Sequence, residues 1–197
     1  MIGGLRASMT ADTALPVWAV RLVSEFEAAD VRAKAVAKGL SSEQLNWYPG
    51  QNAWSVGQCL EHLRMTNEIY LPAISIALNK GVHAKVHEIS LGWLSRWFIR
   101  NYIGPDPNAT RVQAPRKIQP RKQVEPFVLD AFLGSNERAR ELITRAGDYD
   151  VNRIRFKNPF VPLLRFTVGT GLEIVTQHQS RHLRQAEKVR QSAGFPL

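Results

Sequence analysis

Cysteine is almost absent from the sequence, since Cys59 is the one cysteine in 197 residues. A single cysteine excludes a disulfide within the chain and is typical of a reducing compartment. Long apolar runs are also missing, so we expect no membrane-spanning helix. The first residues, MIGGLRASMTADTALPVW, contain neither an apolar stretch nor a recognisable cleavage site, and we expect no signal peptide. These absences favour a soluble, cytoplasmic protein.

Acidic residues are fewer than basic ones, 17 against 26, which gives a formal net charge of +9. Much of the excess lies between Gly81 and Lys122, where eight basic residues face only Glu88 and Asp106. Such a stretch can attract nucleic acid or anionic lipid. More often it is a solvated connection that keeps a protein soluble, and we favour that interpretation. We therefore expect no specific nucleic-acid partner.

Apolar residues recur at helical spacing in four long segments: residues 16–38, 55–80, 126–146 and 172–190. Val168 continues the apolar spacing before the last of them. Pro16 suits a first helical turn, and Gly39, Gly81 and Gly147 suit helix ends. Four long helices around one core is the economical architecture for this pattern. The sequence predicts an all-α fold, a four-helix bundle.

The segments outside these helices have their own composition. Residues 88–103 are rich in aromatics and favour a short helix that packs on the bundle or on a second subunit, rather than a membrane-surface helix. Residues 104–126 hold five prolines and no periodicity, which predicts an extended, basic, proline-rich connection between the second and third long helices. We expect a loose N-terminus over 1–12 and a single domain over 13–197.

Two local signals fall in the second long segment. Ser55 with Gln58 three residues later matches a capping box, which predicts that a helix begins there. Pro72 lies inside the same segment and is expected to kink the helix or remove one backbone hydrogen bond.

Histidines supply the candidate site. His178 and His182 are four residues apart in a helical segment, so both side chains lie on one face. His62 in the second long helix is positioned to face the interior of a bundle. Ligands that project inward from facing helices commonly build metal sites, and three imidazoles leave a coordination position open. On spacing alone, exposed or hydrogen-bonded histidines are an equally good explanation. His83 and His87 form a second pair, which we expect at the surface.

Two longer motifs carry a family resemblance. LSSEQLNWYPGQNAWSVGQCLEHL (Leu40–Leu63) contains Trp-x-Pro followed by Trp-Ser-x-x-Gln-x-x-x-His, and QHQSRHLRQ (Gln177–Gln185) contains His-x-x-x-His-x-x-Gln. In this order and about a hundred residues apart, they resemble the signatures of the DinB/YfiT-like superfamily. The resemblance covers most of the chain from Leu40 onward.

The resemblance implies a four-helix bundle, often homodimeric, that binds one divalent metal ion through His62, His178 and His182. Zinc and nickel are the leading candidates. Characterised relatives include enzymes in which the metal activates a low-molecular-weight thiol, such as bacillithiol transferases and mycothiol-dependent maleylpyruvate isomerases. Many other members have no established reaction. The implied function is a metal-dependent thiol transferase or hydrolase, and the catalytic group is unknown beyond a metal-bound water or thiol.

Several residues near the histidines are candidates for supporting roles. Gln58 and Gln185 lie close to one turn from a histidine and can orient it or the metal-bound water, although Gln58 already has a structural role in the capping box. Arg181 can steer an anionic substrate or thiol, or face solvent. Cys59 is better explained as a small apolar filler than as a ligand. Glu61 projects away from His62, which argues against a general base.

Three hypotheses follow. The first is an enzyme with an open three-histidine metal site that acts on a small-molecule substrate or thiol. The second is a metal-binding bundle without catalysis, used for storage, sensing or assembly. The third, which we favour least, is a binder of nucleic acid or anionic surfaces through residues 81–122.

Overall fold

A computed structural model describes residues 14–51, 53–104, 113–161 and 163–196. The fold is mostly helical, as predicted, and its four long helices are α1 (Val17–Ala37), α3 (Val56–Leu78), α5 (Val128–Ala146) and α6 (Val168–Arg190). The first three begin and end within about two residues of their predicted segments, and α6 begins four residues before the predicted 172–190. The loose N-terminus expected over 1–12 lies outside the described residues.

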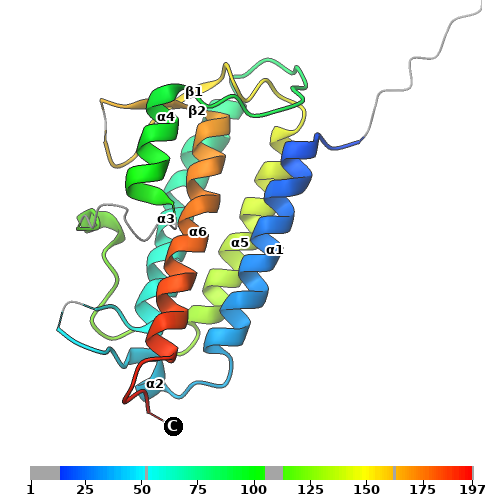
Figure 1. The fold of residues 1–197 in the computed structure, drawn as a ribbon. Coiled ribbons are helices and arrows are strands. Elements are labelled where there is room, and N and C mark those ends of the chain that lie inside the picture. Colours follow the sequence, from blue (N-terminus) through cyan, green and yellow to red (C-terminus); the bar gives the residue numbers. More distant parts are fainter. Residues whose placement is uncertain (1–13, 52, 105–112, 162, 197) are drawn as a thin grey trace, which may run out of the picture.

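The four long helices lie side by side (Figure 1). α3 packs against α5 and α6, and α1 packs against the same two helices. α3 and α5 run in the same direction, because the chain returns along the length of the helices between them (Figure 1). No helix in the described part of the chain has the length and apolar character needed to cross a membrane.

Side-chain caps set several helix ends. Ser55 Oγ accepts a hydrogen bond from the Gln58 N–H, and Gln58 Oε1 accepts one from the Ser55 N–H, which confirms the predicted capping box. The short helix α2 (Ser42–Asn46) begins with a second capping box. Gly39, with φ of +78°, turns the chain after α1 in a conformation that favours glycine. Pro72 lies inside α3, which continues past it.

The return from α3 to α5 is only partly extended. It contains α4 (Trp93–Phe98), a π-helical turn (Ile99–Ile103) and a 3₁₀ turn (Arg116–Ile118). Residues 105–112 of the predicted proline-rich connection lie outside the described residues. We call residues 113–124 the strap, because hydrogen bonds tie this segment to the first turns of α3.

A two-stranded antiparallel sheet precedes α6, and an all-α prediction did not include it. β1 (Arg155–Lys157) pairs with β2 (Arg165–Thr167), with Phe156 opposite Phe166. Both phenylalanines are buried. Strands of three residues are too short for an alternating pattern to be recognised in the sequence.

The core consists of two apolar clusters with a polar layer between them. On each long helix, buried apolar residues lie toward both ends. At mid-height come buried polar residues: His62, Thr66 and Asn67 on α3, Ser135 and Asn136 on α5, and His178, Gln179 and His182 on α6. The candidate histidines are thus part of this polar layer.

Candidate metal centre

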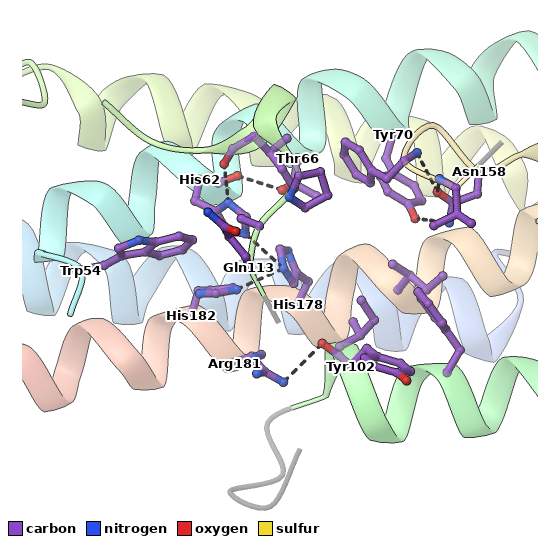
Figure 2. Close-up of a pocket in the computed structure, with 18 residues that line it drawn as sticks. Trp54, His62, Thr66, Tyr70, Tyr102, Gln113, Asn158, His178, Arg181 and His182 are labelled. Carbon is purple, nitrogen blue, oxygen red and sulfur yellow. Dashed lines mark hydrogen bonds between the residues drawn. The ribbon is translucent and has the colours of Figure 1, made fainter. Parts of the chain in front are cut away.

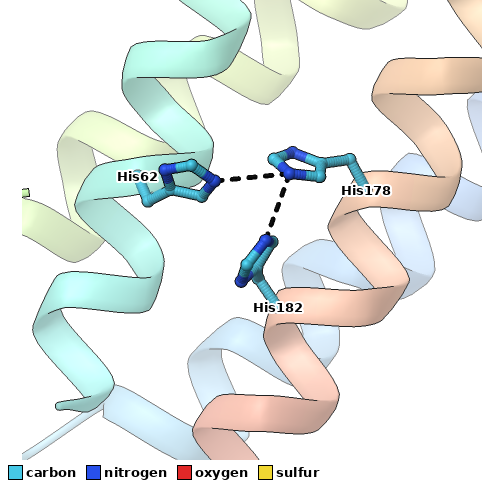
Figure 3. Close-up of side chains that lie close together, drawn as sticks. All are labelled: His62, His178 and His182. Atoms are coloured by element: carbon cyan, nitrogen blue, oxygen red, sulfur yellow. Dashed lines mark hydrogen bonds between the residues drawn. The ribbon is translucent and has the colours of Figure 1, made fainter. Parts of the chain in front are cut away.

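Three histidines converge from two helices. His62 comes from α3, while His178 and His182 come from α6, and all three are buried. A ligand atom from each lies within 4.8 Å of the others, and the rings face a common point (Figure 3). In the described part of the chain, this is the one group of three or more metal-ligating side chains placed so closely.

Hydrogen bonds on the outer nitrogens determine which nitrogens face inward. His62 Nδ1 lies 2.7 Å from the Ile118 carbonyl oxygen, which can only accept, so Nδ1 carries the hydrogen. His182 Nδ1 lies 3.0 Å from Gln185 Oε1 and donates in the same way. Both Nε2 atoms therefore present lone pairs to His178 Nε2, at 3.3 Å from His62 and 3.1 Å from His182.

Burial keeps these imidazoles neutral. It lowers the pKa of His62 to about 4, although the hydrogen bond to the Ile118 carbonyl acts in the opposite direction. Burial, with the neighbouring histidines, lowers the pKa of His178 and His182 well below the ordinary value. His178 Nδ1 has no hydrogen-bond partner among the described residues. When the hydrogen of His178 is on Nδ1, three neutral imidazoles direct Nε2 lone pairs at one point, which is the form that binds a metal ion. The donor set therefore fits a divalent cation.

Trp54 closes one side of the cluster. Its ring packs 4.7 Å from His62 and is stacked on His182 at 5.4 Å between centroids. The sequence gives no signal of these two contacts, because they depend on the packing of Trp54 against helices α3 and α6. Thr66 Oγ1 donates to the His62 carbonyl one turn away.

The three residues predicted to support the histidines make different contacts. Gln185 contacts His182 directly. Gln58 completes the capping box and donates to the Arg121 carbonyl, so its hydrogen bonds are structural. Arg181 Nη1 donates to the carbonyls of Tyr102 and Gly104.

The remaining candidates lie apart from the histidine nitrogens. Cys59 is fully buried, and burial raises the pKa of its thiol well above the ordinary value. Glu61 accepts a hydrogen bond from the Arg121 N–H at 2.7 Å. His83 and His87 are exposed and outside any helix, as expected.

A cavity of about 240 Å³ borders the cluster. Its walls are largely aromatic and apolar (Figure 2). Besides the three histidines they comprise Trp54, Thr66, Tyr70, Phe98, Tyr102, Ile103, Gln113, Ala114, Pro115, Ile118, Asn158, Phe160, Val161, Ile174 and Arg181. Sequence reasoning missed Tyr70, Asn158 and Phe160 as site residues. Tyr70 lies on α3, and Asn158 and Phe160 come beside it because the segment after β1 packs on that helix. Helical periodicity does not reveal this packing.

Comparison with known proteins agrees with these observations. The family model of the DinB superfamily matches residues 25–186, which include all three histidines. The chain is also 24% identical over 164 residues to the uncharacterized protein YuaE of Bacillus subtilis (strain 168), covering 78% of this chain and 88% of that protein. No solved structure matches the chain. The extent of the family match, with the mostly helical fold, shows that the chain belongs to the DinB superfamily.

Proposed function

We propose that His62, His178 and His182 hold one divalent metal ion in a DinB-type four-helix bundle, and that the bordering cavity admits a substrate to it. The convergence of three Nε2 atoms at the edge of a cavity carries this proposal. Imidazole nitrogen suits zinc and nickel, which we consider the leading ions. Three protein ligands leave at least one coordination position for another group.

The chain's own residues prepare the site. Gln185 fixes the ring of His182, and the Ile118 carbonyl fixes the ring of His62. The Nε2 atoms of both rings are therefore oriented without a metal. Trp54 and the aromatic walls exclude water from one side. Arg181, at the cavity wall, brings positive charge toward an anionic substrate or thiolate. A bound divalent ion supplies Lewis acidity and lowers the pKa of a water or thiol beside it.

The reaction class we propose is transfer involving a low-molecular-weight thiol, or hydrolysis by water. The thiol is supported by the resemblance to DinB/YfiT-like enzymes. The competing function is metal binding without catalysis. Ligand access favours the enzyme, because a closed structural site has no need of a cavity at its ligands.

We further propose a homodimer in a reducing compartment. Trp93, Leu94 and Trp97 are exposed on α4, and an apolar face of this kind suits burial against a second copy. The single cysteine agrees with the compartment.

Elemental analysis of the untagged protein tests the metal proposal. We expect about one zinc or nickel ion per chain, retained in His87→Ala and lost in His62→Ala and His182→Ala. His87 is the matched control because it is exposed and outside the cluster. A wild-type protein that holds no divalent ion and takes none up would refute the proposal. A screen of thiols and electrophiles then separates transfer, hydrolysis and simple binding.

A further inference from the structure

The cavity carries a buried polar pair away from the histidines. Tyr70 lies two turns after His62 on α3, which separates their Cα atoms by about 12 Å. Asn158 follows β1 in the hairpin, and each residue is 2% exposed. Both line the cavity, at the opposite end from Trp54 (Figure 2).

The hydrogen bonds of Asn158 define the direction of its contact with Tyr70. Asn158 Oδ1 accepts from the N–H groups of Phe160 at 2.8 Å and Val161 at 3.0 Å. Its Nδ2 therefore faces Tyr70 and donates to the Tyr70 hydroxyl oxygen at 2.9 Å. The Tyr70 oxygen is an acceptor in this contact, so its own hydrogen is not used by Asn158.

The Tyr70 hydrogen is available to a ligand. In the part of the chain that the structure describes, the hydroxyl makes only the bond from Asn158. Burial raises the pKa of Tyr70 well above its ordinary value, so the group keeps its hydrogen at neutral pH. The ring packs against Phe156 and Phe160, which holds the hydroxyl in place. The cavity wall thus contains a fixed donor in aromatic surroundings.

We propose that the cavity binds a substrate with a flat, apolar body and a carbonyl-type acceptor that receives the hydrogen of Tyr70. Asn158 is the positioning residue, because its donated hydrogen bond directs the hydroxyl hydrogen away from itself. A 150 Å³ apolar cavity accommodates benzene, so about 240 Å³ suits a larger ring system. The inference rests on the proposed function in taking this cavity as the substrate site.

Two probes of nearly equal shape test the acceptor. In 2-acetylnaphthalene a carbonyl replaces a methylene group of 2-ethylnaphthalene, so the pair isolates one hydrogen-bond acceptor. Titration calorimetry gives the affinity of each probe for wild-type protein and for Tyr70→Phe. We expect the ketone to bind roughly three- to tenfold more weakly to Tyr70→Phe, which is the effect of one hydrogen bond. The affinity for the hydrocarbon stays unchanged.

Two further variants sharpen the test. In Asn158→Asp one carboxylate oxygen still accepts from Phe160 and Val161, while the other accepts the Tyr70 hydrogen and withdraws it from the ligand. The same selective loss of ketone affinity is expected. Tyr48→Phe is the control, because Tyr48 is exposed and is not among the residues that line the cavity, and we expect no change. The proposal is overturned if wild-type protein binds neither probe, if Tyr70→Phe or Asn158→Asp retains full ketone affinity, or if Tyr48→Phe shows the loss.

Repeating the titrations on chelator-treated protein separates the two proposals. Neither probe has to coordinate a metal ion in order to bind. The protein is therefore expected to prefer the ketone through Tyr70 both with and without metal. If that preference is present in a protein that takes up no divalent ion, the substrate inference stands and the metal proposal fails. If the protein takes up a divalent ion but shows no Tyr70-dependent preference for the ketone, the metal proposal stands and the substrate inference fails.

Discussion

At the residue scale, Gln185 is the side chain that sets the orientation of His182. Its Oε1 accepts the hydrogen of His182 Nδ1, which leaves Nε2 directed at the other two imidazoles. The partner lies on the next turn of the same helix, so both the ring and the group that holds it move together with α6. Removing this hydrogen bond leaves the proposed ligand His182 in the helix but releases its ring.

We expect Gln185→Ala to weaken metal affinity roughly 10- to 100-fold without loss of the fold, as is typical when a ligand's hydrogen-bond partner is removed. Competition against a chromophoric chelator measures the change. Gln191→Ala, at an exposed position just after α6, is the control. Equal affinities in wild type and Gln185→Ala would show that the contact has no role in the site.

Cys59 is expected to be inert in the folded protein. It is fully buried and its thiol pKa is raised by burial, so little thiolate forms at pH 8. Iodoacetamide followed by mass spectrometry is expected to modify Cys59 only in denaturant. Any thiol-dependent activity is expected to survive Cys59→Ala. Rapid modification of the native chain would contradict this assignment.

At the scale of secondary structure, the strap is tied to one face of α3 by three side chains. Gln58 donates to the Arg121 carbonyl, Glu61 accepts from the Arg121 N–H, and His62 donates to the Ile118 carbonyl. The strap also supplies part of the cavity wall. Its position therefore depends on the same turns of α3 that carry a candidate ligand.

Glu61→Ala is expected to loosen the strap, because it removes a hydrogen bond to a charged group and the ion pair with Arg121. A hydrogen bond of this kind contributes about 1.5–3 kcal/mol, so we expect roughly tenfold faster tryptic cleavage between residues 116 and 122. Glu68→Ala, which removes an exposed carboxylate of α3, is the control. The result that argues against this role is equal cleavage in the two variants.

The helices were predictable because their ends carry local signals. Ser55 and Gln58 define a start, and Gly39 defines a stop, from residues next to one another in the sequence. The spacing of His178 and His182 made their shared face predictable for the same reason. The β1–β2 hairpin and the Tyr70–Asn158 contact were not predictable, since they depend on packing between distant segments and on strands too short to show periodicity.

At the scale of the whole molecule, the polar layer joins α3, α5 and α6. Asn136 is its centre, since Oδ1 accepts from Asn67 and Gln179 while Nδ2 donates to Asp30 on α1. Its amide thus connects all four long helices. Buried networks of this kind are stabilising only when their members are satisfied.

We expect Asn136→Ala to lower the free energy of unfolding by about 2–4 kcal/mol, because it leaves several buried partners unpaired. Urea denaturation provides the measurement. Ser135→Ala, which removes a neighbouring hydroxyl that accepts from Asn67, is expected to cost about 1 kcal/mol. A smaller loss in Asn136→Ala than in Ser135→Ala would exclude Asn136 as the centre of the network.

The metal-free protein is expected to lose stability as the pH falls. In the folded state the pKa of His62 is lowered from 6.5 to about 4, and those of His178 and His182 are lowered in the same direction. The unfolded chain therefore binds more protons below pH 6.5, so unfolding is favoured between about pH 6.5 and 4. Urea denaturation of chelator-treated protein at pH 7 and pH 5 checks this. His62→Gln is expected to show a weaker pH dependence, whereas His87→Ala is expected to match wild type.

The polar layer also fixes the alignment of α6 along α3. A slip of α6 by one turn along α3 would move its histidines by about 5.4 Å and separate the amide network at the same time. The amide network that aligns the helices therefore also aligns the three imidazoles, and none of its amides is a proposed ligand. The proposed metal site would then be a preassembled receptor, and we expect removal or exchange of the ion to leave the helical scaffold intact.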